Sequence, residues 1–144
     1  MRDFPLPDNL ADRPHWSPDL VAELAAELAP GGGNARVGSR LVSETETYRV
    51  WLLSLEPGAR LPFHTHVMDY FWTATSPGRA RSRYADGRVE EPVYDLGTTR
   101  HFHFAQGERM THDLENIGDT VLSFTTVEDK RSANPPLPLD DGGA

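Results

Sequence analysis

The sequence predicts an all-β protein, a sandwich or barrel of short strands behind one short helix. From about residue 41 onward, short runs rich in aromatic and β-branched residues follow one another. Turn signals such as Pro57-Gly58, Asp86-Gly87 and Gln106-Gly107 separate these runs at close spacing. Many short strands with frequent turns are typical of β-sandwiches and barrels. The chain has 144 residues, which suits a single domain.

Residues 1–40 are predicted to form a proline-rich arm followed by a short helix. Ser17 can cap the helix and Pro18 fits its first turn, while Asp19 complements its positive end. Pro30 and Gly31 to Gly33 are expected to end the helix.

Residues 41–130 contain the predicted strands. Residues 131–144 form a proline-rich tail that we expect to lie extended on the surface of the protein or of a neighbour. The expected strand segments, with one hairpin around Asp86-Gly87, read TYRVWLLSLEPG, LPFHTHV, DYFWTAT, RARSRYADGRVEEPVY, TTRHFHFA, MTHDLEN and TVLSFTTVED.

Composition excludes several classes of protein. The absence of cysteine rules out disulfides, thiolate metal sites and thiol nucleophiles. The net charge of −8 argues against a nucleic-acid partner. We therefore interpret the stripe Arg79, Arg81 and Arg83 as a solvated strand face, and the acidic pairs Glu90-Glu91 and Asp113-Glu115 likewise. No apolar run is long enough to span a membrane, and the N-terminus lacks a signal-peptide core, so we expect a cytoplasmic protein without a membrane partner.

The histidines are the main indication of function. His64 and His66 are one residue apart, so a strand would place both imidazoles on one face. A polar outer face is one interpretation of such a pair. The apolar neighbours Phe63, Met68 and Tyr70 to Trp72 favour an inward-facing pair, and buried imidazoles need a partner that a divalent metal ion can supply. His112, in another predicted strand, is the best third ligand.

These residues resemble two motifs of the cupin superfamily. Gly58, five further residues and then His64-Thr65-His66 are similar to the first motif, and His112 with Asn116 is similar to the end of the second. The resemblance covers about Tyr48 to Glu128. It implies a cupin-type jelly roll and a single-domain protein with one divalent metal ion per chain.

The sequence departs from the cupin pattern at two points. Gly107 is separated from His112 by four residues without the family's proline. The family's glutamate or glutamine ligand would fall at Tyr70 or Phe71. The resemblance therefore implies a site of His64, His66 and His112, in which Tyr70 is a catalytic residue that hydrogen-bonds a metal-bound water. His101 or His103 would be a fourth ligand only if the RHFHF segment turned its histidines inward.

The expected function is that of a metal-dependent enzyme acting on a carbonyl-bearing or aromatic small molecule. All-imidazole ligation suits zinc or iron first, and nickel, manganese or copper as well. Inward-facing Trp72, Ala80, Ser82 and Tyr84 would line a cavity with few charged groups, to which Phe63 and other apolar residues would add. The resemblance implies either an oxidoreductase, such as a dioxygenase, or a non-oxidative polyketide cyclase, lyase or isomerase.

Two other interpretations remain open at this point. One is a cupin that binds a metal or ligand without turnover, and the other is a structural β-sandwich whose histidines are incidental. A homodimer is expected because the edges of a small sandwich need covering.

Overall fold

The computed structural model describes residues 6–30 and 33–139 of the chain. Residues 1–5 of the predicted arm, Gly31 and Gly32 of the predicted helix stop, and residues 140–144 of the tail lie outside the described residues.

The N-terminal region forms the predicted helix. A 3-10 turn, Leu10–Asp12, precedes helix α1, Pro18–Leu28. The Ser17 hydroxyl accepts a hydrogen bond from the backbone N–H of Leu20 at 3.2 Å, as expected of a cap. Among the described residues, no helix has the length and apolar character that crossing a membrane requires.

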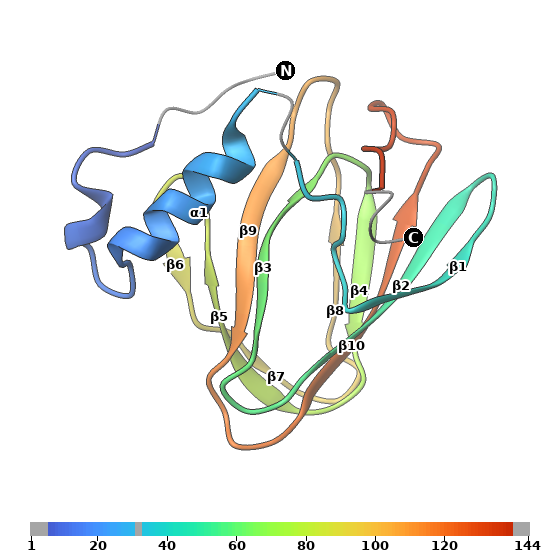
Figure 1. Cartoon of the computed structure of the whole chain (residues 1–144). Coiled ribbons are helices and arrows are strands. Elements are labelled where there is room, and N and C mark those ends of the chain that lie inside the picture. Colours follow the sequence, from blue (N-terminus) through green and yellow to red (C-terminus); the bar gives the residue numbers. More distant parts are fainter. Residues whose placement is uncertain (1–5, 31–32, 140–144) are drawn as a thin grey trace.

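Two antiparallel sheets make up the rest of the fold (Figure 1). The first sheet has the order β1-β2-β10-β4-β8, and the second has the order β3-β9-β5-β6 with β7 paired to β5. The chain passes from one sheet to the other at every step from β2 to β5 and again from β7 to β10, as in a jelly roll. The bounds are β1 Arg40–Glu44, β2 Tyr48–Leu55, β3 Arg60–His66, β4 Tyr70–Ala74, β5 Gly78–Arg83, β6 Val89–Glu90, β7 Val93–Tyr94, β8 Thr99–Phe102, β9 Met110–Asn116 and β10 Leu122–Asp129.

The apolar core lies between the sheets, where alternate residues of each strand meet. Strand β10 shows this most clearly, since Leu122, Phe124, Thr126 and Glu128 are all buried and the residues between them are partly exposed. The buried core cluster consists of Leu53, Leu55, Leu61, Ala74, Ala80, Tyr94, Leu114, Leu122 and Phe124.

A second apolar cluster joins α1 to the outer face of the second sheet. Leu24 of the helix is fully buried, and Trp16 stacks on Phe63 with ring centroids 5.8 Å apart. Phe63 therefore faces the helix and not the space between the sheets, so its predicted place in the cavity wall is wrong.

A β-bulge in β3 explains why Leu61 faces the interior together with His64. Leu61 pairs with Leu114 and His64 pairs with His112, so two residues of β3 stand between the pairs where β9 has one. The extra residue resets the alternation of side chains. As a result Leu61 and His64 both face the interior although they are three positions apart.

Buried ion pairs lie beneath α1, where the sequence suggested solvated strand faces. Asp113 is fully buried and lies 2.7 Å from both Arg60 Nε and Arg83 Nη1. Arg83 also bonds Glu115 and the backbone oxygen of His15. The interpretation of Arg83 and Asp113 as solvated is therefore wrong, because the helix covers this face of the sheet.

The described part of the C-terminal tail packs on the chain's own barrel. The Asn134 amide donates to the carbonyl oxygens of Val67 and Ala105, at 3.0 Å each. The Leu137 carbonyl accepts from Arg49 at 3.1 Å.

Candidate metal centre

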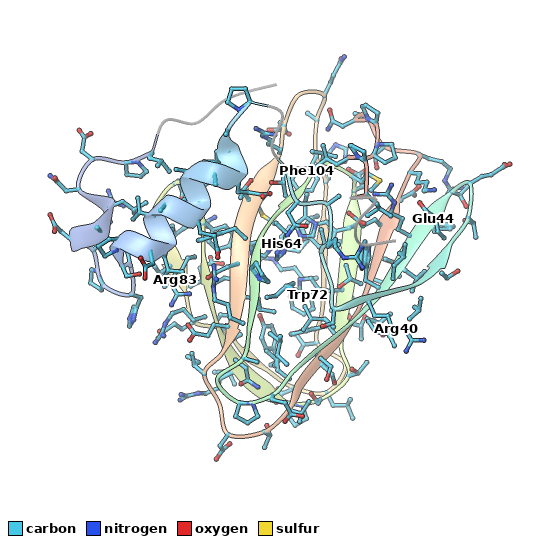
Figure 2. All side chains as sticks on the ribbon, in the orientation of Figure 1. Arg40, Glu44, His64, Trp72, Arg83 and Phe104 are labelled. Atoms are coloured by element: carbon cyan, nitrogen blue, oxygen red, sulfur yellow. The ribbon has the colours of Figure 1, made fainter. Side chains whose placement is uncertain are left out.

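The three predicted ligands come together between the sheets. His64 and His66 extend from β3 and His112 from the adjacent strand β9, and one nitrogen of each lies within 4.8 Å of the others. Figure 2 shows His64 and Trp72, which extend from opposite sheets, in the region between the two sheets. Nitrogens bound to one ion at bond lengths of about 2.1 Å stand at most about 4.2 Å apart, so the three rings would move slightly inward around an ion.

Hydrogen bonds select the tautomer of two of these histidines. His64 Nδ1 lies 2.8 Å from the carbonyl oxygen of Pro62, which can only accept, so Nδ1 carries the proton. The Ser82 hydroxyl donates to the Asp113 carbonyl at 2.8 Å, which leaves its oxygen to accept from His112 Nδ1 at 3.3 Å. In both rings Nε2 is then the nitrogen with a free lone pair, as metal-binding histidines require.

His66 differs from the other two. Its Nδ1 is buried and has no hydrogen-bond partner among the described residues. An unpaired buried polar atom costs free energy, and one ring nitrogen of each of the three histidines lies within 4.8 Å of the others. A divalent cation would satisfy them, so the residues present fit such an ion.

The histidines are neutral at physiological pH. Burial lowers the pKa of His64 to about 4, and burial also lowers the pKa values of His66 and His112 well below the ordinary value. Since only neutral imidazole binds metal, a cation would not have to displace protons above about pH 5.

Tyr70 lies directly against the histidines, from the opposite sheet. Its ring stacks on His66 with centroids 3.9 Å apart and planes 10° apart. Burial raises the pKa of the Tyr70 phenol well above its ordinary value, so the phenol stays protonated and can donate a hydrogen bond. This placement is compatible with the predicted catalytic role, which stays a prediction.

The paired histidines of the RHFHF segment lie outside this group. His101 and His103 are exposed, and His103 bonds Asp69 at 3.0 Å. The phenylalanines take the inward side instead, since Phe102 stacks on Tyr70 and Phe104 is buried. Among the described residues, the group able to bind a metal contains His64, His66 and His112 and no fourth member.

A cavity of about 480 Å³ opens beside the three histidines. Its wall is largely aromatic, as the sequence predicted. It also includes three charged residues where few were expected, namely Glu90, Glu91 and Arg100. Side chains that line it from the two sheets include Leu53, Leu61, Tyr70, Trp72, Ser82, Tyr84, Tyr94, Phe102, Leu114, Phe124 and Thr126.

Glu90 takes part in the wall through Tyr84. The Tyr84 hydroxyl donates to Glu90 at 2.8 Å, and the Tyr84 ring stacks on His112 with centroids 5.2 Å apart. Burial and the bond to Glu90 raise the pKa of Tyr84 to about 12. Glu90 is partly exposed, as the sequence suggested, and also contributes to the cavity wall.

Two polar residues on the inner sides of their strands were missed from the sequence, the exposed Arg100 and the buried Glu128. Arg100 is two positions from Phe102, so the inward assignment of Phe102 could have placed Arg100 on the cavity side by strand alternation. Glu128 follows the inward pattern of β10 and accepts a hydrogen bond from Trp51 Nε1 at 2.8 Å. Burial raises the pKa of Glu128 to about 7.

Comparison with known proteins supports the fold but says little about the activity of this chain. No family model matches the sequence. The chain is 33% identical over 78 residues to oxalate decarboxylase OxdC of Bacillus subtilis, and the match covers 53% of this chain and 19% of that protein. The chain thus spans only a small part of that relative.

Solved structures resemble a larger part of the chain. A cupin domain from Bordetella pertussis has a TM-score of 0.55 at 21% identity, covering 63% of this chain and 90% of that one. A double-stranded β-helix protein from Klebsiella pneumoniae has a TM-score of 0.52 at 24% identity, covering 65% and 76%. A cupin from Methanocaldococcus jannaschii has a TM-score of 0.51 at 18% identity, covering 62% and 76%. The chain therefore has the cupin fold, a jelly roll also known as the double-stranded β-helix.

Proposed function

We propose that this protein is a metal-dependent enzyme that acts on a carbonyl-bearing or aromatic small molecule. The observation that carries the proposal is the convergence of His64, His66 and His112 beside an aromatic cavity of about 480 Å³. Three protein ligands with positions left for water or substrate are typical of catalytic rather than structural metal sites. Zinc or iron is the first expectation, and nickel, manganese and copper also suit the ligands.

The bound ion would supply Lewis-acid polarisation of a carbonyl, or redox chemistry if it is iron. The chain's own residues supply orientation and proton donation. Trp72, Tyr94 and Phe102 offer flat apolar faces to a substrate, and their bulk excludes water from the reacting end. The Tyr70 hydroxyl donates a hydrogen bond to a substrate oxygen beside His66, because its raised pKa keeps the proton on the phenol.

The enzyme class follows from the metal. With iron, the proposed reaction is oxidative, as in a dioxygenase. With zinc, it is a non-oxidative cyclisation, lyase or isomerase reaction. The local likeness to OxdC is a likeness to an enzyme, which supports turnover in general.

The test combines metal analysis with turnover. Untagged protein is analysed by plasma mass spectrometry and then assayed with diketones and polyphenols, by oxygen consumption and by absorbance. We expect about one metal ion per chain and turnover that His112→Ala abolishes. Equal turnover in wild type and His112→Ala would contradict the proposal.

A non-catalytic metal- or ligand-binding protein is the second candidate. One observation favours it. Among the described residues no carboxylate joins the three histidines, and Glu90 in the wall is already bonded to Tyr84 and Arg88. Stoichiometric binding of metal and ligand without turnover in these assays would select this candidate.

A further inference from the structure

Arg100 is a charged residue on the inner side of an edge strand. In β8 it stands two positions from Phe102, and the two residues lie opposite Trp72 and Tyr70 of β4. Since side chains alternate along a strand, Arg100 shares the inward side with Phe102. Both residues line the cavity.

A continuous stack connects Arg100 to the candidate metal centre. The Tyr70 ring lies 3.9 Å from His66, and the Phe102 ring lies 4.5 Å from Tyr70 with planes only 6° apart. The Arg100 guanidinium lies over the Phe102 ring, 4.8 Å from its centroid. Stacking of this kind fixes a guanidinium in place while its N–H groups remain available.

The charge of Arg100 is not neutralised within the described residues. Its contact there is the Phe102 ring, and no carboxylate pairs with it. The acidic groups of the same cavity do have partners. Glu90 bonds Tyr84 and Arg88, and Glu91 bonds Arg81 at 2.7 Å. Arg100 is thus the one lining charge of the described cavity without an ionic partner.

The field of Arg100 also reaches into the cavity. Burial raises the pKa values of Tyr70, Tyr84 and Tyr94, and the positive charge of Arg100 works to lower each of them. Three phenols from different parts of the chain therefore lie within its electrostatic range. A net charge of −8 makes the rest of the protein repel anions, so a local cation decides whether an anion can enter.

We infer that Arg100 binds the carboxylate of the substrate, and that the substrate class is an aromatic or conjugated carbonyl compound bearing one carboxylate. The planar guanidinium matches a carboxylate with two parallel hydrogen bonds. The strand rise places Arg100 about 7 Å along β8 from the level of Tyr70, close to the length of one substituted aromatic ring. A substrate of this size would reach from Arg100 to the histidines. This inference rests on the proposed function for the reacting end of the molecule.

The test measures selectivity for a carboxylate with two flat probes of nearly equal size. Benzoate and its neutral counterpart benzamide are titrated into the full chain by calorimetry, before and after metal loading. We expect benzoate to bind at least about tenfold more tightly than benzamide, since a charge-assisted pair contributes this much. Arg100→Gln should remove the preference, Arg100→Lys should retain part of it, and added salt should weaken benzoate alone.

The matched control is Arg40→Gln, which removes the same charge from an exposed strand residue (Figure 2). It should leave both affinities unchanged. A measurement on the wild type does not depend on the variants folding: benzoate, and not benzamide, should shift the Nε–H resonance of Arg100.

The outcomes separate this inference from the proposed function. Loss of the benzoate preference in Arg100→Gln supports carboxylate binding by Arg100. If no metal binds to the same protein, only the proposed metal-dependent function is contradicted. Metal binding and turnover, together with an unchanged preference for benzoate in Arg100→Gln, would contradict carboxylate binding by Arg100 and leave the proposed function intact. An unshifted Arg100 resonance in benzoate-saturated protein would also contradict carboxylate binding by Arg100.

Discussion

A backbone carbonyl fixes the tautomer of His64 that can bind a cation. The Pro62 carbonyl, two residues earlier, fixes the proton on Nδ1, and burial lowers the pKa of the ring to about 4. The free lone pair of Nε2 therefore exists before any ligand arrives. Because the ring does not have to lose a proton on binding, none of the binding free energy is spent on deprotonating it.

Replacing a histidine of the candidate site should remove the metal. His64→Ala and His112→Ala are expected to bring metal content, measured by plasma mass spectrometry, close to zero. Zinc should raise the melting temperature of the wild type and not of these variants, because binding to the folded state alone stabilises it. His101→Ala is the control and should behave as the wild type. Metal retained in His112→Ala would show that another side chain completes the site.

Tyr70 is expected to act in turnover and not in metal retention. Tyr70→Phe keeps the stack on His66 and removes only the hydroxyl. We expect full metal content and a turnover number that falls by about 10²-fold or more, the usual scale for loss of a proton donor. Steady-state kinetics on the substrate found in the screen would measure it, and an unchanged turnover number would leave Tyr70 a wall residue.

Glu128 should make stability depend on pH. Its pKa of about 7 in the folded protein exceeds the ordinary 4.5, so the folded state binds the proton more tightly. This contribution is fully present below about pH 4.5 and is lost as pH rises through 7. Glu128→Gln, which can still accept from Trp51, should therefore gain up to about 3 kcal/mol relative to wild type at pH 8 and much less at pH 5. Urea unfolding at both values measures the difference; an equal effect at both would contradict the shift.

Among the elements, β3 shows how far strand patterns can predict a site. Strand alternation was enough to put His64 and His66 on one face, and the inward choice followed from their apolar neighbours. Alternation from His64 puts Phe63 on the outer face, where it lies, but alternation fails at Leu61, because the bulge beside Phe63 depends on how β9 pairs with β3. The partner strand is distant in sequence, so the residues around Phe63 carry no sign of it.

Helix α1 explains a second limit. From the sequence, a charged residue in a strand is expected to face solvent, and this expectation fails where another element covers it. Arg83 and Asp113 are covered by α1, which lies some 90 positions before Asp113 in the printed sequence. The helix itself was predictable, since its cap and stop are local signals. Which strand residues the helix covers was not predictable, because that depends on the packing of the whole chain.

The ion pairs under α1 should be sensitive to the loss of Asp113. Asp113→Asn removes the charge that both Arg60 and Arg83 contact, and leaves two guanidinium groups close together. Breaking a buried pair in this way costs about 3 kcal/mol or more. Urea unfolding should show this loss, while Asp119→Asn at an exposed turn should change stability by less than about 0.5 kcal/mol. Equal stability of the two variants would mean that α1 does not depend on these pairs.

For the whole molecule, the jelly-roll fold was more predictable than the set of residues that line its cavity. Turn spacing and the His-x-His pattern were enough for the fold and for the three histidines. The charged residues of the cavity required knowledge of which strands face one another across the interior, which emerges only from the complete topology.

The homodimer stays a prediction. Val93 and Leu96 are each 72% exposed, and a contact with a second chain would cover them. One chain has a mass of 16.0 kDa, so light scattering should return about twice that value. A monodisperse mass of one chain would contradict the prediction.

All three candidate ligands extend from β3 and β9, whereas Tyr70, Trp72, Arg100 and Phe102 extend from β4 and β8 of the other sheet. Metal retention and molecular recognition are therefore encoded in separate stretches of the chain. A library randomised at Trp72, Arg100 and Phe102 should yield variants that keep their metal while accepting different molecules. Selection, natural or in the laboratory, could then change what the cavity admits without rebuilding the centre beside it.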